Sequence, residues 1–529
     1  MTAYLRALAA EWTKFRTMRG WVAAVMVAAG LIVGLGLLPG LGGSCGKNGP
    51  GSECVLPVGP GGEEVTDSFT FVHQPLAGDG SVTVRLTGLT GRLPGTDSGG
   101  PRPGLVPWAK AGLIVRAATT PGAAYAAVMM TGANGVRLQY DFTHDVAGKP
   151  GSVSAEAPRW LRLTRAGDTV TAAESTDGVA WTTVGSARLT GLPSTVEAGL
   201  FVTSPQYAEE VDDGLGAGAM GGPSHATGVF DRLALAGGWQ GDAWKTDVIG
   251  AAGGPGGDPG GGAGAPGGAP SGPSGPGTVA AAPDLTTGAE RAGDTLRLTG
   301  SGDIAPAVPG AAGIGVTISS TLVGTFAGLI VVVVLGAVFV TAEYRRGLIR
   351  TTFAASPHRV RLLVAKATVV GGVTFVAGLV AAAVVVTLGQ DVLRGNGVYL
   401  HPASTATEVR VVAGTAALLA VAAVLALALG TLLRRGVTAV TTAVVVIVMP
   451  YLLAMTVLPT PAGEWVLRVS PAAAFALQQA SPAYPQVANL YIPANGYYPL
   501  APWAGLAVLA GWAAVALMAA AALLRKRDA

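Results

Sequence analysis

The chain has 529 residues, of which 50% are hydrophobic and only 12% are charged, and its mean hydropathy is +0.49. Charged residues make up roughly a quarter of an average soluble domain, so this composition excludes an ordinary soluble enzyme. The net charge of +3 is too small to indicate nucleic-acid binding. Residues 40–318 carry 16 Lys and Arg against 25 Asp and Glu, whereas the remainder carries 18 against 6. We therefore expect one polar, acidic body and one apolar body with cations at its edges.

Residues 1–20 predict an amphipathic helix. Its large apolar residues recur at three- and four-residue spacing, while the cations lie elsewhere around the helix. The apolar set is Tyr4, Leu5, Leu8, Trp12 and Phe15. We expect this helix to lie on the cytoplasmic membrane surface. The alternative is a plain basic leader.

Six uncharged, apolar runs are long enough to cross a bilayer core of ~30 Å, which takes about 20 helical residues. The first predicted span covers residues 21–39. The other five lie in a membrane domain at 318–529 and cover about 322–342, 367–390, 411–433, 436–458 and 503–524. A cleaved signal peptide is the alternative for the first run. We favour a retained span, because its core of 18 residues is long and no A-x-A-like site follows it.

The cations set the expected orientation, because short loops rich in Lys and Arg stay in the cytoplasm. Fifteen cations border the spans on the side of the two termini, against three in the outer loops of the membrane domain. We expect a multi-pass protein with both termini in the cytoplasm and the long segment after the first span outside the cell.

The outer segment begins with a connector at 40–64 that holds both cysteines of the chain, Cys45 and Cys54. Two cysteines on the oxidising side of a membrane are expected to pair, and the disulfide would close this connector. A Gly/Pro-rich linker at 246–283 lacks the apolar residues needed to fold. A short segment at 284–317 follows, and we expect it to cap the outer mouth of the membrane domain.

Residues 65–245 predict an all-β domain, because apolar residues alternate with polar ones from Val82 to Leu86 and from Val136 to Phe142. The turn at residues 165–167 and the dipeptide Asp177-Gly178 predict consecutive hairpins. Many short strands with regular turns are typical of an antiparallel sandwich. The fold class is therefore an α-helical polytopic membrane protein with six transmembrane helices and an inserted antiparallel jelly-roll sandwich.

About residues 65–237 also resemble the concanavalin-like, laminin-G-like jelly-roll families. The resemblance is carried by residues 67–71, 107–113, 160–163, 167–168 and 175–181. It implies a cell-wall glycan as a possible ligand. No pair of carboxylates stands out as acid and base for a glycosidase. For the acidic patch Glu209, Glu210, Asp212 and Asp213 we favour a solvated loop over a calcium site.

The longest cytoplasmic loop is basic and carries two apolar anchors. It comprises Glu343, Tyr344, Arg345, Arg346, Gly347, Leu348, Ile349 and Arg350, and continues to Lys366. Together with residues 10–17, 465–474 and 523–527 it resembles the ABC-2 type permeases. That resemblance spans residues 1–40 and 304–529. It implies that the loop forms a coupling helix seated in a separate ABC ATPase subunit, and that the permease works as a homodimer or paired with another permease. The alternative is that these cations only set topology and contact anionic lipid.

The expected function follows from these patterns. The predicted spans hold no ionisable groups of the kind used for ion coupling, and no nucleotide motif or metal-ligand spacing is present, so energy must come from a partner. We expect no enzyme activity and no cofactor or metal. The resemblance implies the permease subunit of an ATP-driven exporter in a bacterial cell membrane, moving a hydrophobic or amphipathic substrate. The alternative is a membrane-anchored protein that binds or senses an extracellular glycan.

Overall fold

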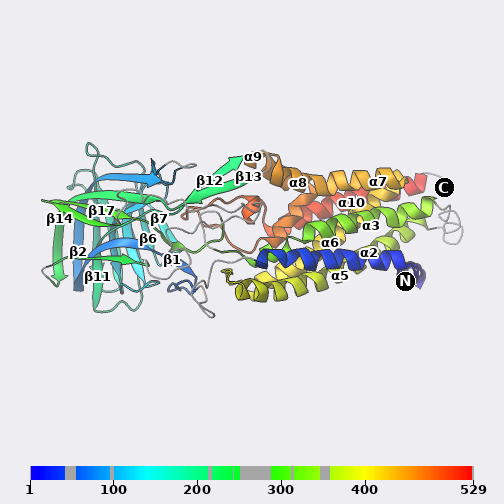
Figure 1. The fold of residues 1–529 in the computed structure, drawn as a ribbon, viewed down its shortest axis with the longest axis horizontal. Coiled ribbons are helices and arrows are strands. Elements are labelled where there is room, and N and C mark those ends of the chain that lie inside the picture. Colours follow the sequence, from blue (N-terminus) through cyan, green and yellow to red (C-terminus); the bar gives the residue numbers. More distant parts are fainter. Residues whose placement is uncertain are drawn as a thin grey trace, which may run out of the picture.

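The computed structural model describes residues 2–41, 55–95, 100–212, 217–241, 243–250, 287–310, 315–345 and 358–526. An antiparallel β-sandwich and a helical bundle lie end to end (Figure 1). The labels N and C both lie at the end of the bundle that is remote from the sandwich (Figure 1). The sandwich and the chain termini therefore occupy opposite ends of the molecule.

Six helical stretches in the described part of the chain are long and apolar enough to cross a membrane, which agrees with the six predicted spans and indicates a membrane location. The helices are α1 (Thr2–Thr17), α2 (Arg19–Gly36), α3 (Thr325–Arg345), α5 (Arg359–Gly395), α6 (Thr405–Leu433), α7 (Gly436–Ala443), α8 (Met449–Thr456), α9 (Thr460–Val469) and α10 (Pro502–Lys526). A π-helical segment, Val444–Val448, joins α7 to α8. Pro450 follows it and cannot donate a backbone hydrogen bond, which explains the local change of helical pitch.

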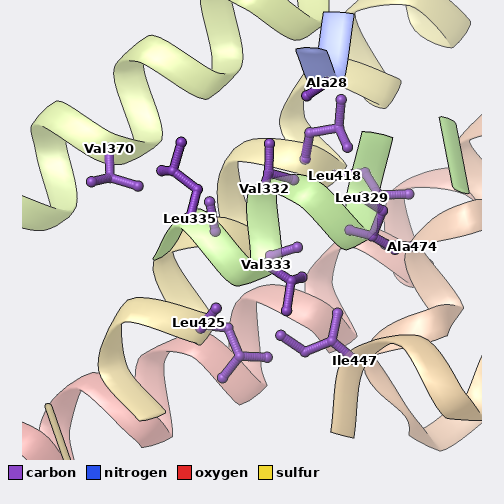
Figure 2. Packing of buried hydrophobic residues seen from close by; sticks show 14 of the residues in the cluster. Ala28, Leu329, Val332, Val333, Leu335, Val370, Leu418, Leu425, Ile447 and Ala474 are labelled. Carbon is purple, nitrogen blue, oxygen red and sulfur yellow. The ribbon is translucent and has the colours of Figure 1, made fainter. Parts of the chain in front are cut away.

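Small residues bring α3 and α6 into backbone contact at the centre of the bundle. A Cβ atom at Gly336 would overlap the carbonyl oxygen of Ala423, and one at Gly430 would lie 2.8 Å from that of Ala337. Leu329, Val332 and Val333 of α3 belong to one buried cluster with Leu418 and Leu425 of α6 (Figure 2). Close approach through Gly and Ala is how helices gain packing energy where lipid is as apolar as the side chains.

The sandwich is built from strands that pair antiparallel. They are β1 (Val65–Asp67), β2 (Phe69–Leu93), β3 (Arg102–Pro103), β4 (Lys110–Arg116), β5 (Tyr125–Thr131), β6 (Val136–Tyr140), β7 (His144–Ala147), β8 (Arg159–Ala166), β9 (Thr169–Ser175), β10 (Thr182–Arg188), β11 (Thr195–Thr203), β12 (Tyr207–Asp212), β13 (Ala217–Gly222), β14 (His225–Trp239), β15 (Lys245–Ile249), β16 (Gly288–Ala292), β17 (Thr295–Gly300) and β18 (Ile304–Pro306).

The long strand β2 links the two layers. Its first half pairs with β11 and β15, and its second half pairs with β8 and β14. The change of partners falls at Gly78, whose φ of 64° is a left-handed conformation that favours glycine. Beyond it Val82, Val84 and Leu86 are buried, as their alternation predicts.

The predicted hairpin around residues 165–167 is confirmed, since β8 and β9 pair with Ala166 opposite Thr169. The segment 284–317 differs in part from expectation. Strand β17 pairs with β14, and β18 pairs with β1, so residues 288–306 complete the sandwich. The end of the segment contacts the helical bundle, where Val316 pairs with Leu400. Residues on both sides of the linker thus contribute to one domain, a long-range pairing that local periodicity does not reveal.

Candidate functional site

The predicted coupling loop is described only at its beginning. Glu343, Tyr344 and Arg345 form the last turn of α3. Arg346, Gly347, Leu348, Ile349 and Arg350 lie outside the described residues, as do Cys45 and Cys54 of the predicted disulfide. The structure therefore describes the contacts of the two helices that border the loop, α3 before it and α5 after it.

An ionic cluster joins these two ends to α1. The Lys366 ammonium on α5 donates to Glu11 Oε2 on α1 at 2.8 Å and to Glu343 Oε1 on α3 at 2.6 Å. Lys14 on α1 forms a further ion pair with Glu343. Glu11, Glu343 and Lys366 are all buried, each less than 5% exposed. We call these four residues the inner ionic cluster.

The inner ionic cluster has two carboxylates and two ammonium groups, so its charges balance. Its surroundings are aromatic: Lys366 Nζ lies 5.3 Å from the ring centre of Phe339, which in turn packs against Phe15 and Trp21. Buried charges are tolerated only with close partners, and removal of one partner is costly. The cluster therefore fixes α1, α3 and α5 relative to one another at the loop.

Two further contacts extend this arrangement to the other helices. The Arg434 guanidinium, at the turn between α6 and α7, lies 5.3 Å from the ring centre of Tyr344. Arg359 at the start of α5 donates to the carbonyl oxygen of Leu524 on α10 at 3.1 Å. The residues next to the loop on either side are thus connected to most of the bundle.

The sequence predicts Glu343 as part of the coupling loop but predicts no shared site with Glu11, Lys14 and Lys366. One signal was available, since Glu11 is the only acidic residue in the first 50 and stands three positions before Lys14. That spacing places both side chains on one face of a helix. The contact of this helix face with Glu343 and Lys366 joins distant parts of the sequence, so local spacing does not reveal it.

Lys14 is expected to make stability depend on pH. Burial, and next the nearby Lys366 charge, lower the pKa of Lys14 to about 8 from 10.5. Between these values the unfolded chain binds the proton and the folded chain does not, so the free energy of unfolding rises with pH across that window. Denaturation in detergent at several pH values measures this slope. Lys14→Met is expected to flatten it, and an unchanged slope would contradict the assignment.

The strands through which the chain enters and leaves the sandwich are held by buried ion pairs, at a region we call the neck. The Arg116 guanidinium donates to both carboxylate oxygens of Asp67, at 3.0 and 2.8 Å, and both side chains have no exposed surface. Lys110 donates to Asp303 at 2.6 Å and to the carbonyl oxygen of Ile304 at 2.7 Å. Strand β4 thereby holds both β1 and β18.

The neck also contacts the segment between α9 and α10. Gln486 donates to the carbonyl oxygen of Thr143 at 3.2 Å, and Asn489 and Tyr497 donate to that of Pro309 at 2.8 and 3.1 Å. Burial raises the pKa of the Tyr497 phenol to about 12. By sequence, the aromatic and proline-rich residues 458–500 predict a position along the outer membrane interface. Tyr497 instead packs into the contact between the two domains.

A hairpin of β12 and β13 reaches from the sandwich towards α9 (Figure 1). Glu210 on β12 accepts a hydrogen bond from the Thr460 hydroxyl at the start of α9. Glu209 pairs with Arg102 at 3.4 Å. Within the described ranges no group of three or more acidic, His or Cys side chains could hold a metal ion.

Solved structures match parts of the chain only weakly, with TM-scores of 0.23 and below. No family model and no curated protein matches it. A crystal structure of scytalido-glutamic peptidase with a transition-state analogue inhibitor is 11% identical and has a TM-score of 0.23; the match covers 44% of this chain and 98% of that one. A functionally unknown protein from Saccharomyces cerevisiae is 16% identical, with a TM-score of 0.20 over 32% of this chain and 75% of that one. A mutant of the GH43 protein BlXynB from Bacillus licheniformis is 14% identical, with a TM-score of 0.17 over 23% of this chain and 24% of that one.

Proposed function

We propose that this chain is the membrane-spanning subunit of an ATP-driven exporter of the ABC-2 type, and that a separate ATPase drives it through the loop between α3 and α5. The observation that carries the proposal is the inner ionic cluster. It ties the helix before the loop and the helix after it to the amphipathic helix α1, through Lys366 contacts of 2.6 and 2.8 Å. A force applied at the loop is therefore passed to three helices together.

The chemistry of the loop suits an acidic surface on a partner. Arg345 is exposed at the end of α3, and the sequence continues with Arg346, Leu348, Ile349 and Arg350. Guanidinium groups around a small apolar centre are typical of protein interfaces. In this proposal the loop and both termini are cytoplasmic, because the cations gather at that end of the bundle.

In this proposal the sandwich lies on the extracellular end of the helical bundle and moves with it. Its neck is rigid because Arg116, Asp67 and Lys110 are buried and paired. It is joined to residues 486–497 of the outer loop and, through Glu210, to Thr460 on α9. A movement of α9 or of the outer loop would therefore reposition the whole sandwich, as expected of an outer gate.

Charge reversal in the loop tests the proposal. In Arg346→Glu with Arg350→Glu, co-purification of an ATPase from native membranes is expected to fall at least about tenfold, since two interface charge pairs become repulsive. The readout is the amount of a nucleotide-binding chain, identified by mass spectrometry, per chain of this protein.

The matched control reverses two cations at the same end of the bundle, Arg525→Glu with Lys526→Glu. It changes the net charge equally and is expected to retain the ATPase. The proposal fails if the loop variant inserts into the membrane normally and still co-purifies with undiminished ATPase.

Glycan recognition by the sandwich is the second candidate, and the aromatic side chains argue against it. Sugar rings stack on open aromatic faces, but arginines lie over Trp160 and Trp181. The guanidinium of Arg162 lies 3.8 Å from the ring centre of Trp181, and Arg85 and Arg232 lie 5.9 and 5.8 Å from that of Trp160. We therefore place export ahead of glycan binding.

A further inference from the structure

An apolar groove runs between α2 and α3 at the end of the bundle that carries the chain termini. It has a volume of about 470 Å³, within the usual range of roughly 300–1,000 Å³ for small-molecule sites. Met18, Gly20 and Ala24 line one side, and Val331, Val334 and Val338 line the other. A Cβ atom built at Gly20 meets nothing within 4 Å, so the groove is open at this residue.

The length and depth of the groove fit a lipid chain. The α3 residues that line it extend from 330 to 338, a helical rise of about 12 Å. Half of a bilayer core is about 15 Å. Because the groove begins at the elbow between α1 and α2, where the chain enters the first span, it covers the depth of a single leaflet.

Cations stand at the mouth of this groove. Arg16 and Arg19 flank Met18, both are exposed, and neither forms an ion pair with another residue of the described segments. On the outward side of α1, Leu5 and Trp12 are 54% and 47% exposed, so they can rest in the headgroup region beside the groove. An apolar groove with two exposed guanidinium groups at the end nearest the headgroup region complements an anionic amphiphile.

We propose that this groove binds one anionic glycerophospholipid of the cytoplasmic leaflet, with an acyl chain between α2 and α3 and the phosphate against Arg16 and Arg19. The proposal rests on the orientation given above for the proposed function. The bound lipid would brace the elbow at Trp21, which lines the groove and packs against Phe339 beside the inner ionic cluster. It would thereby set the tilt of α1, which supplies Glu11 and Lys14 to that cluster.

The test uses the full chain in nanodiscs made of equal parts phosphatidylglycerol and phosphatidylcholine, with retained lipid counted by native mass spectrometry. The unaltered protein is expected to retain phosphatidylglycerol preferentially. Arg16→Gln with Arg19→Gln is expected to lower that preference at least about tenfold, because each cation near a headgroup contributes to the attraction. Gly20→Trp is expected to fill the groove and abolish retention of either lipid, and Gly20→Leu to reduce it.

The matched control is Gly34→Trp, which alters the same helix at another glycine with open space around it and outside the groove. It is expected to retain phosphatidylglycerol. The proposal is overturned if Gly20→Trp and Gly34→Trp retain the same lipid, or if retention shows no preference for phosphatidylglycerol. It is also overturned if the unaltered protein carries no lipid but forms dimers that Gly20→Trp abolishes, because the groove would then hold a second copy. Phosphatidylglycerol retention without any co-purifying ATPase would keep the lipid site and reject the exporter.

Discussion

Replacing Lys366 with methionine is expected to lower the free energy of unfolding of the bundle by about 3–5 kcal/mol. Lys366 is 2% exposed and is the partner that Glu11 and Glu343 share. Without Lys366, the inner ionic cluster keeps one cation, the ammonium of Lys14, for the two buried carboxylates of Glu11 and Glu343. The cluster then carries an uncompensated negative charge in apolar surroundings. Unfolding in detergent, followed by circular dichroism, measures the loss.

Two further variants separate charge balance from packing in this experiment. Lys366→Met with Glu11→Gln restores neutrality, leaving Glu343 paired with Lys14, and is expected to recover a large part of the stability. Arg394→Met alters an exposed cation at the opposite end of the same helix and is expected to change stability by about 0.5 kcal/mol or less. If Lys366→Met is as stable as Arg394→Met, the cluster does not hold the three helices together.

At the other end of the molecule, Arg116→Met is expected to destabilise the sandwich by about 3–5 kcal/mol. Asp67 is also fully buried, and among the described residues its carboxylate keeps, without Arg116, only the hydrogen bond from the Gly122 amide at 2.8 Å. Loss of the Arg116–Asp67 pair weakens β1, which pairs with β18. We therefore expect the neck to unfold before the rest of the sandwich. Hydrogen exchange of the β1 and β18 amides in the full chain, measured at increasing urea concentration, reports on the neck.

An exposed ion pair provides the comparison for Arg116. In the pair Arg102–Glu209 the side chains are 43% and 53% exposed, and Arg102→Gln is expected to cost about 0.5 kcal/mol. Arg116→Met with Asp67→Asn removes both buried charges and should regain part of the loss. Equal effects of Arg116→Met and Arg102→Gln would mean that the neck does not depend on its buried pair.

The membrane helices could be predicted from the sequence because a bilayer demands long uncharged helices, a local property of about 20 residues. The β8–β9 hairpin could be predicted for a similar reason, since alternation and a turn lie within one short stretch. The contact of β17 with β14 could not, because the two strands are separated by more than 50 residues and a linker. The position of Tyr497 was missed for a related reason: an aromatic residue next to a span suits the membrane interface and a domain contact equally well.

The sequence by itself determined the division into a polar sandwich and an apolar bundle, the six long helices, and the gathering of cations at one end. These properties depend on composition and on periods of two or 3.6 residues, which neighbouring residues express without any tertiary contact. Only the tertiary structure decided that Glu11, Glu343 and Lys366 meet in one buried cluster, and that Arg116 holds the neck through Asp67. Such ion pairs join residues 23 to 355 positions apart, and the low dielectric that makes each partner indispensable exists only once the helices and strands have packed.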